Sequence, residues 1–420
     1  MANSKKGTTL TLPTALTDQC KQTYQTENQS QAINTALSDY LLLPYNEQKI
    51  DDDAMIELLS AEDERNCRKV GIRIPADMLT IISELEGENN RSETVMRMLA
   101  DILVHPLNPD AKPTSRLLYI LGNKWNSEMQ DAIKQIHTTH TCAWEHSVET
   151  CFGGCGIFAN FTFAPDRIIA DSDWRKTNLL RAIQASPRIL IQKARTLKVN
   201  RETFADLKEK MEAATPTSPI NMEAAAGFLY LNLTSILGRC ESFDKNATDK
   251  KYRERLSQIY PLHLESQGVK IGDEDIFVTL KKYRKMSNTL FIVDPPYLDT
   301  PGYEDRVVTE EPAYGMGFSL KQHQDLARLL RNIKQKNGND FMYFCRITVN
   351  RAVDQTTKEP KKSKKELEQE DKRLKRKIDR LYPGYDLYYL DVQTLSDGTI
   401  ERIITTFPFE GATPYGREVH

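Results

Sequence analysis

The sequence predicts an α/β chain that begins with a repeated strand–helix–helix segment. Two stretches near the N-terminus, 9–42 and 71–104, align with each other without a gap. From about Arg116, short apolar runs alternate with stretches of helical periodicity, which is the pattern of an α/β sheet. Near the C-terminus, "YDLYYLDVQTL" and "TIERIITTFPF" are joined through Ser396-Asp397-Gly398 and indicate an antiparallel hairpin.

Composition is that of a globular chain large enough for more than one core. The chain has 420 residues, of which 39% are hydrophobic and 28% charged, with a formal net charge of -2. No apolar run approaches a membrane span, and "MANSKKGTTL" lacks the apolar centre of a signal peptide. Seven cysteines form no disulfide framework, so we expect a cytoplasmic protein with no membrane partner.

Each N-terminal repeat starts with a short alternating strand that ends at a proline, Pro13 or Pro75, and continues into an amphipathic helix. A polar turn follows, and a serine, Ser30 or Ser92, is placed to cap a second helix with one apolar face. The apolar strand positions stay in register between the repeats. The expected inward residues of the strands are Leu10, Leu12, Ile72 and Ile74.

This repeat resembles the ribbon-helix-helix module of small bacterial repressors. In that family two copies pair their strands into a ribbon that enters the major groove of DNA. On one chain, repeats 1–45 and 67–109 with the connector 46–66 would form an internal pseudo-dimer; the alternative is that they only mediate oligomerisation, for example as a homodimer. The resemblance implies DNA contact by outward residues, namely Thr9, Thr11, Lys69, Gly71 and Arg73.

A glycine cluster, Phe152-Gly153-Gly154-Cys155-Gly156, directly follows an apolar strand. Glycines at the carboxyl end of a strand let the backbone approach a ligand closely, although such a cluster can also be a tight turn. The cluster lacks the spacing of a phosphate loop or of a dinucleotide fingerprint. The next predicted strand ends in Asp171, where a nucleotide-binding sheet places an acid on ribose hydroxyls.

The order of glycine turn, acid, long intervening segment and Asp-Pro-Pro-Tyr resembles the DNA adenine-N6 methyltransferases of the Dam and phage type. The resemblance implies a Rossmann-like sheet over 115–420, with a mostly helical target-recognition insertion at about 174–259. It also implies S-adenosylmethionine as cofactor, double-stranded DNA as partner, and a bacterial nucleoid or phage-infected cell as location. The cofactor-binding residues that it carries over are Lys124, Glu149, Phe152, Gly154, Gly156, Asp171 and Asp275, and Arg239 is an expected DNA contact in the insertion.

The same resemblance gives a role to "LFIVDPPYLDT", where prolines end a buried strand at an acid and an aromatic ring. Asp294 would accept one N–H of the exocyclic amine of adenine, and the carbonyl of Pro295, fixed by Pro296, would accept the other. Tyr297 would stack on the base, which must leave the duplex to be reached. Such a site works by positioning and charge complementarity and requires no metal.

Two other features have simpler interpretations. The charged run at about 355–382 is expected to be a solvated helix or a mobile insertion. No standard zinc spacing is present, although four possible ligands lie close together: His137, His140, Cys142 and His146.

Two functions therefore remain open. The first is an active adenine methyltransferase whose repeats add DNA affinity or site choice. The second is a DNA-binding transcriptional regulator that carries a non-catalytic methyltransferase-like domain. The intact set of Asp171, Asp294 and Tyr297 favours the enzyme.

Overall fold

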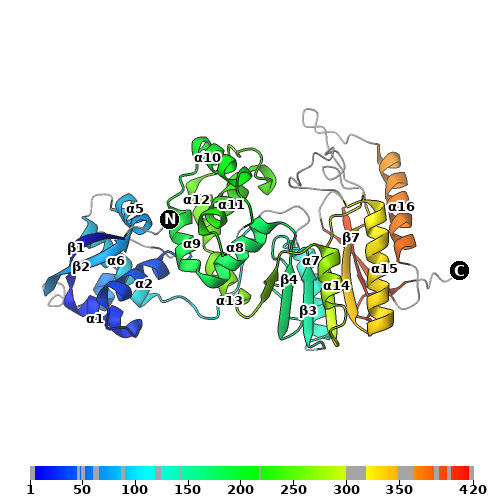
Figure 1. Cartoon of the computed structure of the whole chain (residues 1–420), viewed down its shortest axis with the longest axis horizontal. Helices are drawn as coiled ribbons and strands as arrows, with labels where there is room; N and C mark the ends of the chain where they lie inside the picture. The colour runs from blue at the N-terminus through cyan, green and yellow to red at the C-terminus, as the bar shows by residue number, and fades with distance from the viewer. Residues whose placement is uncertain are drawn as a thin grey trace. The chain divides into compact units, whose positions relative to one another are not determined.

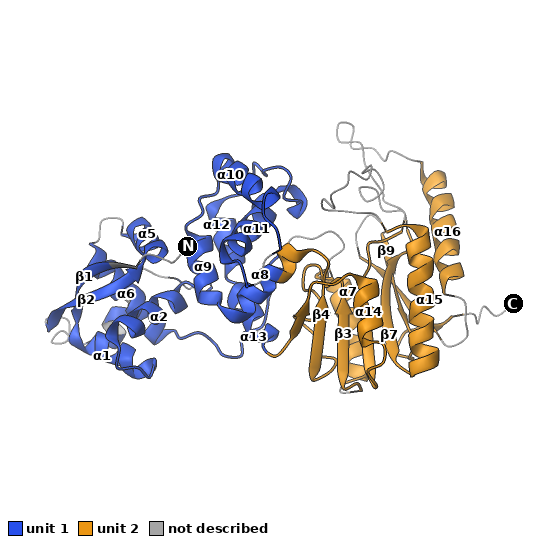
Figure 2. Cartoon of the chain, viewed as in Figure 1, with its two compact units in different colours: residues 1–121, 178–267 blue, residues 122–177, 268–420 orange. Residues whose placement is uncertain are grey.

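The chain divides into two compact units (Figure 2): unit 1 comprises Met1–Leu121 and Asn178–Gln267, and unit 2 comprises Gly122–Thr177 and Gly268–His420. Most of the expected connector 46–66, Cys142 and the Ser396-Asp397-Gly398 turn lie outside the described residues. The computed structural model describes residues 5–44, 48, 53–59, 66–86, 90–118, 124–141, 143–216, 219–298, 318–348, 363–382, 387–394 and 399–415.

Unit 1 begins with a two-stranded antiparallel ribbon of β1 (Lys5–Pro13) and β2 (Cys67–Pro75), in which Thr9 lies opposite Gly71. These two residues are the first of the two aligned stretches, so the ribbon is centred on a pseudo-two-fold axis that relates the repeats. The strands alternate as expected, with one face buried and the other exposed. The buried residues include Leu10, Leu12, Ile72 and Ile74.

Each strand is followed by two helices: α1 (Thr14–Thr23) and α2 (Gln29–Tyr40) in the first repeat, and α5 (Ala76–Leu85) and α6 (Arg91–Val104) in the second. A short helix, α3 (Asp53–Leu58), lies between the repeats in the chain and contacts α6. This arrangement within one chain is the one that the gapless repeat predicted.

The expected capping serines do not cap these helices. Asn28 and Asn90 cap α2 and α6 instead, each accepting a backbone N–H with its side chain. The hydroxyl of Ser30 accepts the N–H of Arg73 at 3.2 Å, and that of Ser92 accepts the N–H of Thr11 at 2.9 Å. The serines therefore satisfy backbone donors on the strand of the opposite repeat, and both bonds obey the pseudo-two-fold axis.

The remaining part of unit 1 is a helical insertion in the sheet domain. Its elements are α8 (Trp174–Ala185), which begins in unit 2, then α9 (Pro187–Arg195), α10 (Arg201–Glu212), α11 (Met222–Thr234), the 3-10 helix η1 (Ile236–Gly238), α12 (Asp249–Leu256) and α13 (Ile259–Ser266). Within the described part of the chain, no helix is long and apolar enough to cross a membrane.

Unit 2 contains an eight-stranded mixed sheet of order β10-β8-β9-β7-β6-β3-β4-β5. The strands β7, β6, β3, β4 and β5 run parallel, and β8 and β9 form the antiparallel hairpin. The five strands expected above are present, and β7 lies between β6 and β9. Their bounds are β3 (His146–Thr150), β4 (Asp166–Ala170), β6 (Thr289–Val293), β7 (Asp340–Arg346), β8 (Tyr388–Gln393) and β9 (Ile400–Thr405); the two others, β5 (Lys270–Gly272) and β10 (Thr413–Pro414), are too short to give a sequence pattern.

Helices cover both faces of this sheet (Figure 1). On one face α14 (Ile276–Tyr283), α15 (Leu320–Asn337) and α16 (Lys364–Leu381) pack on alternate residues of the strands, such as Phe291 and Val293. On the other face α7 (Ser127–Thr139) packs on the intervening residues, such as Leu290 and Ile292. Because both faces are buried, the central strands are apolar throughout.

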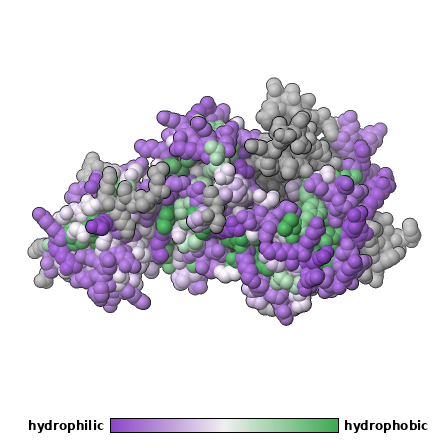
Figure 3. Space-filling view, in the orientation of Figure 1, coloured by the Kyte–Doolittle hydropathy of each residue, from purple (hydrophilic) through white to green (hydrophobic). Residues whose placement is uncertain are grey.

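The charged run expected to be solvated or mobile is, in its described part, the helix α16. Residues 355–362 of this run lie outside the described residues. Its outward residues are charged, and the surface at α15 and α16 is mainly hydrophilic on the face seen in Figure 3. The inward face of α16 carries a stripe of apolar residues that packs into the core of unit 2. The many charges around this stripe hid it in the sequence. The stripe comprises Leu367, Leu374, Ile378 and Leu381.

A buried arginine ties α16 to the C-terminal hairpin. Arg402 is 1% exposed, and its guanidinium binds the carboxylate of Asp391 with two nitrogens, at 2.5 and 2.8 Å. The same guanidinium contacts Asp379 of α16 at 2.9 Å and the Tyr415 hydroxyl at 3.1 Å, and lies 4.0 Å from the centre of the Tyr389 ring. A buried charge is tolerated here because every side of it is partnered.

We expect Arg402→Ala to destabilise unit 2 by about 2–3 kcal/mol, because it removes a buried side chain together with its bonds to Asp391, Asp379 and Tyr415. Thermal and denaturant unfolding of the full chain measure this loss. The control is Arg328→Ala, since Arg328 on α15 is 69% exposed and pairs only at the surface with Asp325. Equal unfolding midpoints for the two variants would contradict the role given to Arg402.

Candidate active site

The carboxyl ends of β3 and β6 lie where the strand order of the sheet reverses, because β4 flanks β3 on one side and β6 on the other. Open α/β sheets bind ligands at such a switch point. Thr150 and Val293 are paired at these two ends, and the glycine turn and Asp294 follow them directly. The topology therefore places the two sequence motifs side by side.

Asp294 lies in a cluster of buried polar groups around Lys124. The lysine ammonium is 2.9 Å from the carboxylate of Asp294 and 3.4 Å from that of Glu401, and it also contacts the hydroxyl of Tyr297. Tyr297 donates its hydroxyl proton to Glu401 at 2.8 Å. Lys124 is only 2% exposed, so these charge-assisted bonds form out of contact with water.

Two carboxyl groups at this site, those of Asp294 and Glu149, have raised pKa values. Burial raises the pKa of Asp294 to about 6, and the attraction of Lys124 only partly opposes this. Burial and the charge of Asp294 raise the pKa of Glu149, on β3, to about 8. Oε2 of Glu149 is buried without a hydrogen-bond partner among the described residues. Three carboxyl groups beside one lysine form a site that suits a cationic ligand.

The glycine turn is held in an irregular conformation by its neighbours. Cys151, Gly153 and Cys155 have φ of 57°, 50° and 64°, in the left-handed region that few non-glycine residues adopt. Phe152 is buried in the turn. The carbonyl of Gly154 accepts the indole N–H of Trp125 at 2.8 Å, which ties the turn to the segment that carries Lys124.

Gly156 makes room for that segment. A Cβ at Gly156 would lie 3.0 Å from the carbonyl carbon of Lys124 and 3.1 Å from its nitrogen, which is too close for either backbone to tolerate without moving. The carbonyl of Gly156 also accepts the side-chain amide of Gln130 at 2.8 Å. Because Gly156 has no side chain, the backbone of Lys124 can lie close to the glycine turn.

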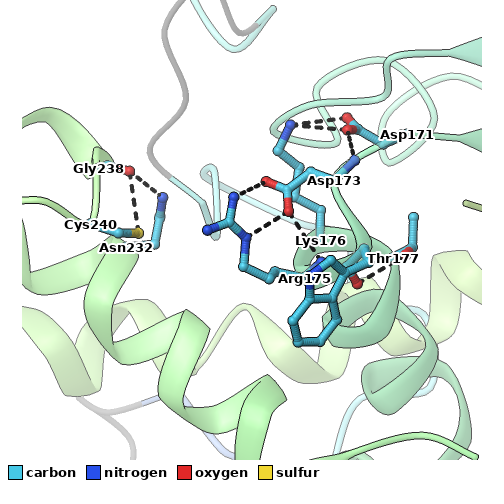
Figure 4. A network of polar contacts seen from close by, with 9 residues as sticks. Asp171, Asp173, Arg175, Lys176, Thr177, Asn232, Gly238 and Cys240 are labelled. Atoms are coloured by element: carbon cyan, nitrogen blue, oxygen red, sulfur yellow. Dashed lines mark hydrogen bonds and ion pairs between the residues drawn. The ribbon is translucent and has the colours of Figure 1, made fainter. Parts of the chain in front are cut away.

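Asp171 follows β4 and belongs to a buried polar network, shown in Figure 4. Its carboxylate accepts the N–H of Gly153 at 3.2 Å and that of Asp173 at 3.0 Å, and pairs with Lys176 at 3.0 Å. Although burial opposes it, the attraction of Lys176 and Arg175 lowers the pKa of Asp173. The network joins the glycine turn to the start of α8.

Asp275 is the exposed N-cap of α14. Its carboxylate accepts the N–H groups of Phe277 at 2.7 Å and Val278 at 3.0 Å. Burial raises the pKa of the Cys151 thiol, and the charges of Asp171, Asp294 and Asp275 raise it further. Asp275 is therefore near enough to the glycine turn to act on it electrostatically.

Sequence reasoning missed Glu401 and Lys176. Glu401 is 6% exposed, and it reaches the cluster from β9, more than a hundred residues after Asp294 in the chain. One signal was available, since "TIERIITTFPF" contains two adjacent charges within an apolar strand, and buried charges need partners. Nothing in the sequence indicated that Lys176 pairs with Asp171, except that the two residues lie five positions apart.

In unit 1, Arg239 lies exposed beside a loop that follows α11. Ile236 and Leu237 in this loop are 51% and 59% exposed, which is unusual for large apolar side chains. The side-chain amide of buried Asn232 donates a hydrogen bond to the carbonyl of Gly238 in this loop at 2.8 Å (Figure 4). The loop thus offers two apolar side chains and a guanidinium to solvent.

The candidate DNA-binding residues of the ribbon all lie on its exposed face, namely Thr9, Thr11, Lys69 and Arg73. Two of the possible zinc ligands contact backbone carbonyls. Nε2 of His137 lies 3.0 Å from the carbonyl oxygen of Thr162, and Nε2 of His140 lies 2.8 Å from that of Pro408. In the described ranges, no three His, Cys, Asp or Glu residues are grouped as metal ligands.

We expect Gly156→Ala to destabilise unit 2 by about 1–3 kcal/mol, because the new methyl group collides with the backbone of Lys124. Unfolding without any ligand measures this effect separately from catalysis. Gly227→Ala is the matched control, since a Cβ there would make ordinary contact at 3.5 Å inside helix α11. If Gly156→Ala unfolds like the unaltered chain, the glycine does not serve this approach.

Comparison with known proteins addresses the sheet domain. No curated protein matches the chain. A family model, the D12 class N6 adenine-specific DNA methyltransferases, matches residues 121–375, which is more than half of the chain. The match includes the glycine turn, the helical insertion and Asp294, and it ends within α16, before the hairpin that carries Glu401. The chain therefore belongs to the D12 class N6 adenine-specific DNA methyltransferase family.

Proposed function

We propose that Asp294 and the residues around it methylate the N6 amine of an adenine flipped out of double-stranded DNA, with S-adenosylmethionine as the methyl donor. The observation that carries this proposal is the partly buried carboxylate of Asp294 at the switch point of the sheet, beside Glu149, whose Oε2 has no hydrogen-bond partner among the described residues. Family membership supports the reaction, and the geometry supports the choice of residues.

The residues at the switch point fit S-adenosylmethionine, which carries a sulfonium, an ammonium and a ribose with two hydroxyls. Oε2 of Glu149, which has no partner in the described part of the chain, and the excess of carboxyl groups would hold the cationic end. Asp171 would accept a ribose hydroxyl, and Asp275 would read the adenine of the cofactor. Phe152 and Gly154 would line the turn around it. When bound, the cofactor supplies an electrophilic methyl group.

Lys124 would bind and position residues of the Asp-Pro-Pro-Tyr segment. Its ammonium already pairs with Asp294, Tyr297 and Glu401, and its backbone lies against Gly156. We infer that Lys124 stabilises the ionised form of Asp294, which must accept an N–H of the target amine. This differs from the direct cofactor contact expected from the sequence.

The target base would be held by four consecutive residues. The Asp294 carboxylate and the Pro295 carbonyl would each accept one N–H, which favours the pyramidal nitrogen needed for attack, and Pro296 would fix the turn. Tyr297 would stack on the base, with its hydroxyl anchored by Glu401. The proton leaves the amine only after methylation, so the site needs no strong base.

Unit 1 would supply the contacts to the rest of the duplex. The exposed ribbon face would enter a groove through Thr9, Thr11, Lys69 and Arg73, in the manner of a ribbon-helix-helix repressor. Arg239 would bind a phosphate or a base edge. The exposed Ile236 and Leu237 beside it suit a wedge between base pairs, whose contacts are apolar.

The repeats 1–45 and 67–109 would form a ribbon-helix-helix-like module, and 174–259 would hold target recognition. A homodimer through these repeats would need a surface other than the ribbon, because β1 and β2 already pair with each other. The protein would act at a bacterial nucleoid or in a phage-infected cell.

The alternative function is a DNA-binding regulator that keeps the sheet only as a scaffold. Such a protein would bind DNA through unit 1 but would transfer no methyl group. The buried cluster around Lys124 favours the enzyme, because burying a lysine with two carboxyl groups is unfavourable unless their arrangement serves a purpose.

We expect Asp294→Asn to reduce methyl transfer by a factor of about 10²–10³, because the amide no longer accepts the amine proton with a full charge. Incorporation of tritiated methyl groups into DNA of mixed sequence measures transfer, and calorimetry should show that the cofactor still binds. The control is Asp325→Asn on the exposed surface of α15, which should leave transfer unchanged. Near-normal turnover of Asp294→Asn would disprove the mechanism, and an inactive unaltered chain would favour the regulator.

Cofactor binding should release protons near neutral pH. Glu149 has a raised pKa of about 8 in the free protein, so its carboxyl is mostly protonated at pH 7, whereas a bound cation favours the carboxylate. Affinity should therefore rise with pH by up to about tenfold per unit below pH 8 and level off above it. Calorimetry in buffers of different ionisation enthalpy counts the protons. Glu149→Gln should remove this pH dependence; if it persists, Glu149 does not face the cofactor.

A further inference from the structure

The N-terminal repeats and the helical insertion share a buried interface within unit 1. Helix α9 of the insertion packs against both α2 and α5 of the repeats. Its residues Leu190, Ile191 and Ala194 are fully buried. Packing of one helix against two helices of the repeats is typical of elements that share one folded unit, and segments joined only by a tether do not show it.

Polar contacts fix the geometry of this interface. Arg188 of α9 binds the carboxylate of Asp39 on α2 with two nitrogens, at 2.5 and 3.0 Å, and Asp39 is 5% exposed. The amide of Gln192 donates to the hydroxyl of Ser38 at 2.6 Å, and both side chains are buried. Paired planar groups of this kind set orientation as well as attraction. The ribbon is therefore held in one orientation relative to the insertion.

The exposed face of the ribbon is chemically asymmetric, although its fold is pseudo-symmetric. Arg73 lies opposite Gly7 at one end, and Lys69 lies opposite Thr11 at the other. A ribbon of two identical strands would present the same pair at both ends. An arginine can bind guanine with two hydrogen bonds, whereas a lysine is a point charge, so the two ends favour different bases.

We propose that the ribbon and the helical insertion read one bipartite DNA site, in which a second sequence, read by the ribbon, lies at a fixed distance and in a fixed orientation from the sequence that the insertion contacts. The proposal rests on the proposed function, in which the insertion contacts the duplex around the target. A flexible tether would let the ribbon bind at many spacings. The interface at Arg188 removes that freedom, and the asymmetry of the ribbon gives the second sequence a direction.

The test starts from a library of random double-stranded DNA, the full chain and S-adenosylmethionine at limiting protein concentration. Sequencing of methylated adenines should show a second preferred sequence at constant distance on one side only. The same library is sorted by binding to the chain, so that an inactive protein would refute the proposed methyl transfer while the bound pool still tests the spacing.

Insertions between the two sequences then measure rigidity. Adding five base pairs turns the second sequence by about half a helical turn, and adding ten displaces it by about 34 Å on the same face. We expect each insertion to reduce methylation or binding about tenfold or more. Unchanged preference at both spacings would overturn the proposal while leaving DNA contact by the ribbon intact. A single short preferred sequence in both pools would overturn it as well.

Variants assign the effect to residues. Arg73→Ala should lose the preference for the second sequence and keep the short context of the adenine. Arg188→Ala should tolerate the insertions several-fold better, and Arg188→Lys, which keeps the charge but loses the paired bonds, serves if the alanine variant does not fold. The matched control is Arg328→Ala in unit 2, which should retain both the preference and the spacing. An Arg73→Ala variant with an unaltered preference would refute the reading by the ribbon.

Discussion

The arrangement of the site depends on one buried ammonium group. The backbone of Lys124 lies so close to Gly156 that a side chain there would crowd it, and the charge of Lys124 attracts Asp294, Tyr297 and Glu401. Lys124 and these partners come from three distant parts of the chain. Removal of the ammonium would leave the carboxyl groups of Asp294 and Glu401 without a counter-charge in a site that is largely buried. The positions of the glycine turn, the end of β6 and the C-terminal hairpin are thus mutually dependent.

Much of the fold could be predicted because its signals are local. The strands of the sheet are recognisable in the sequence as apolar runs. The gapless repeat predicted the pairing of β1 with β2 and the burial of Leu10 and Ile72. The errors concern choices between neighbouring polar residues. Asn28 and Ser30 are both good capping residues by type, and only the proximity of the opposite strand decides that the serine bonds to Arg73.

The candidate site was only partly accessible to the same reasoning. Asp294 and the glycine turn lie in short motifs, so the sequence places them. Glu401 joins Tyr297 through pairing of β9 with β7, and no pattern of spacing reports a contact across such a separation. The contacts of Lys124 with Asp294, Tyr297 and Glu401 were hidden for the same reason, since they form only in the folded sheet. The apolar stripe of α16 was masked by the density of charges around it.

The pairing of the two repeats within one polypeptide has a consequence for how the ribbon is maintained. Two separate chains that share a ribbon lose it on dilution, because association carries a cost in translational freedom. Here both strands belong to the same molecule, so the ribbon persists even when a cell holds a single copy. Covalent linkage also frees the halves to diverge, and they have done so: Asp39 in the first repeat binds the insertion, whereas its counterpart Asp101 in the second binds His105 at 3.2 Å. A symmetric dimer could not have assigned these two tasks separately.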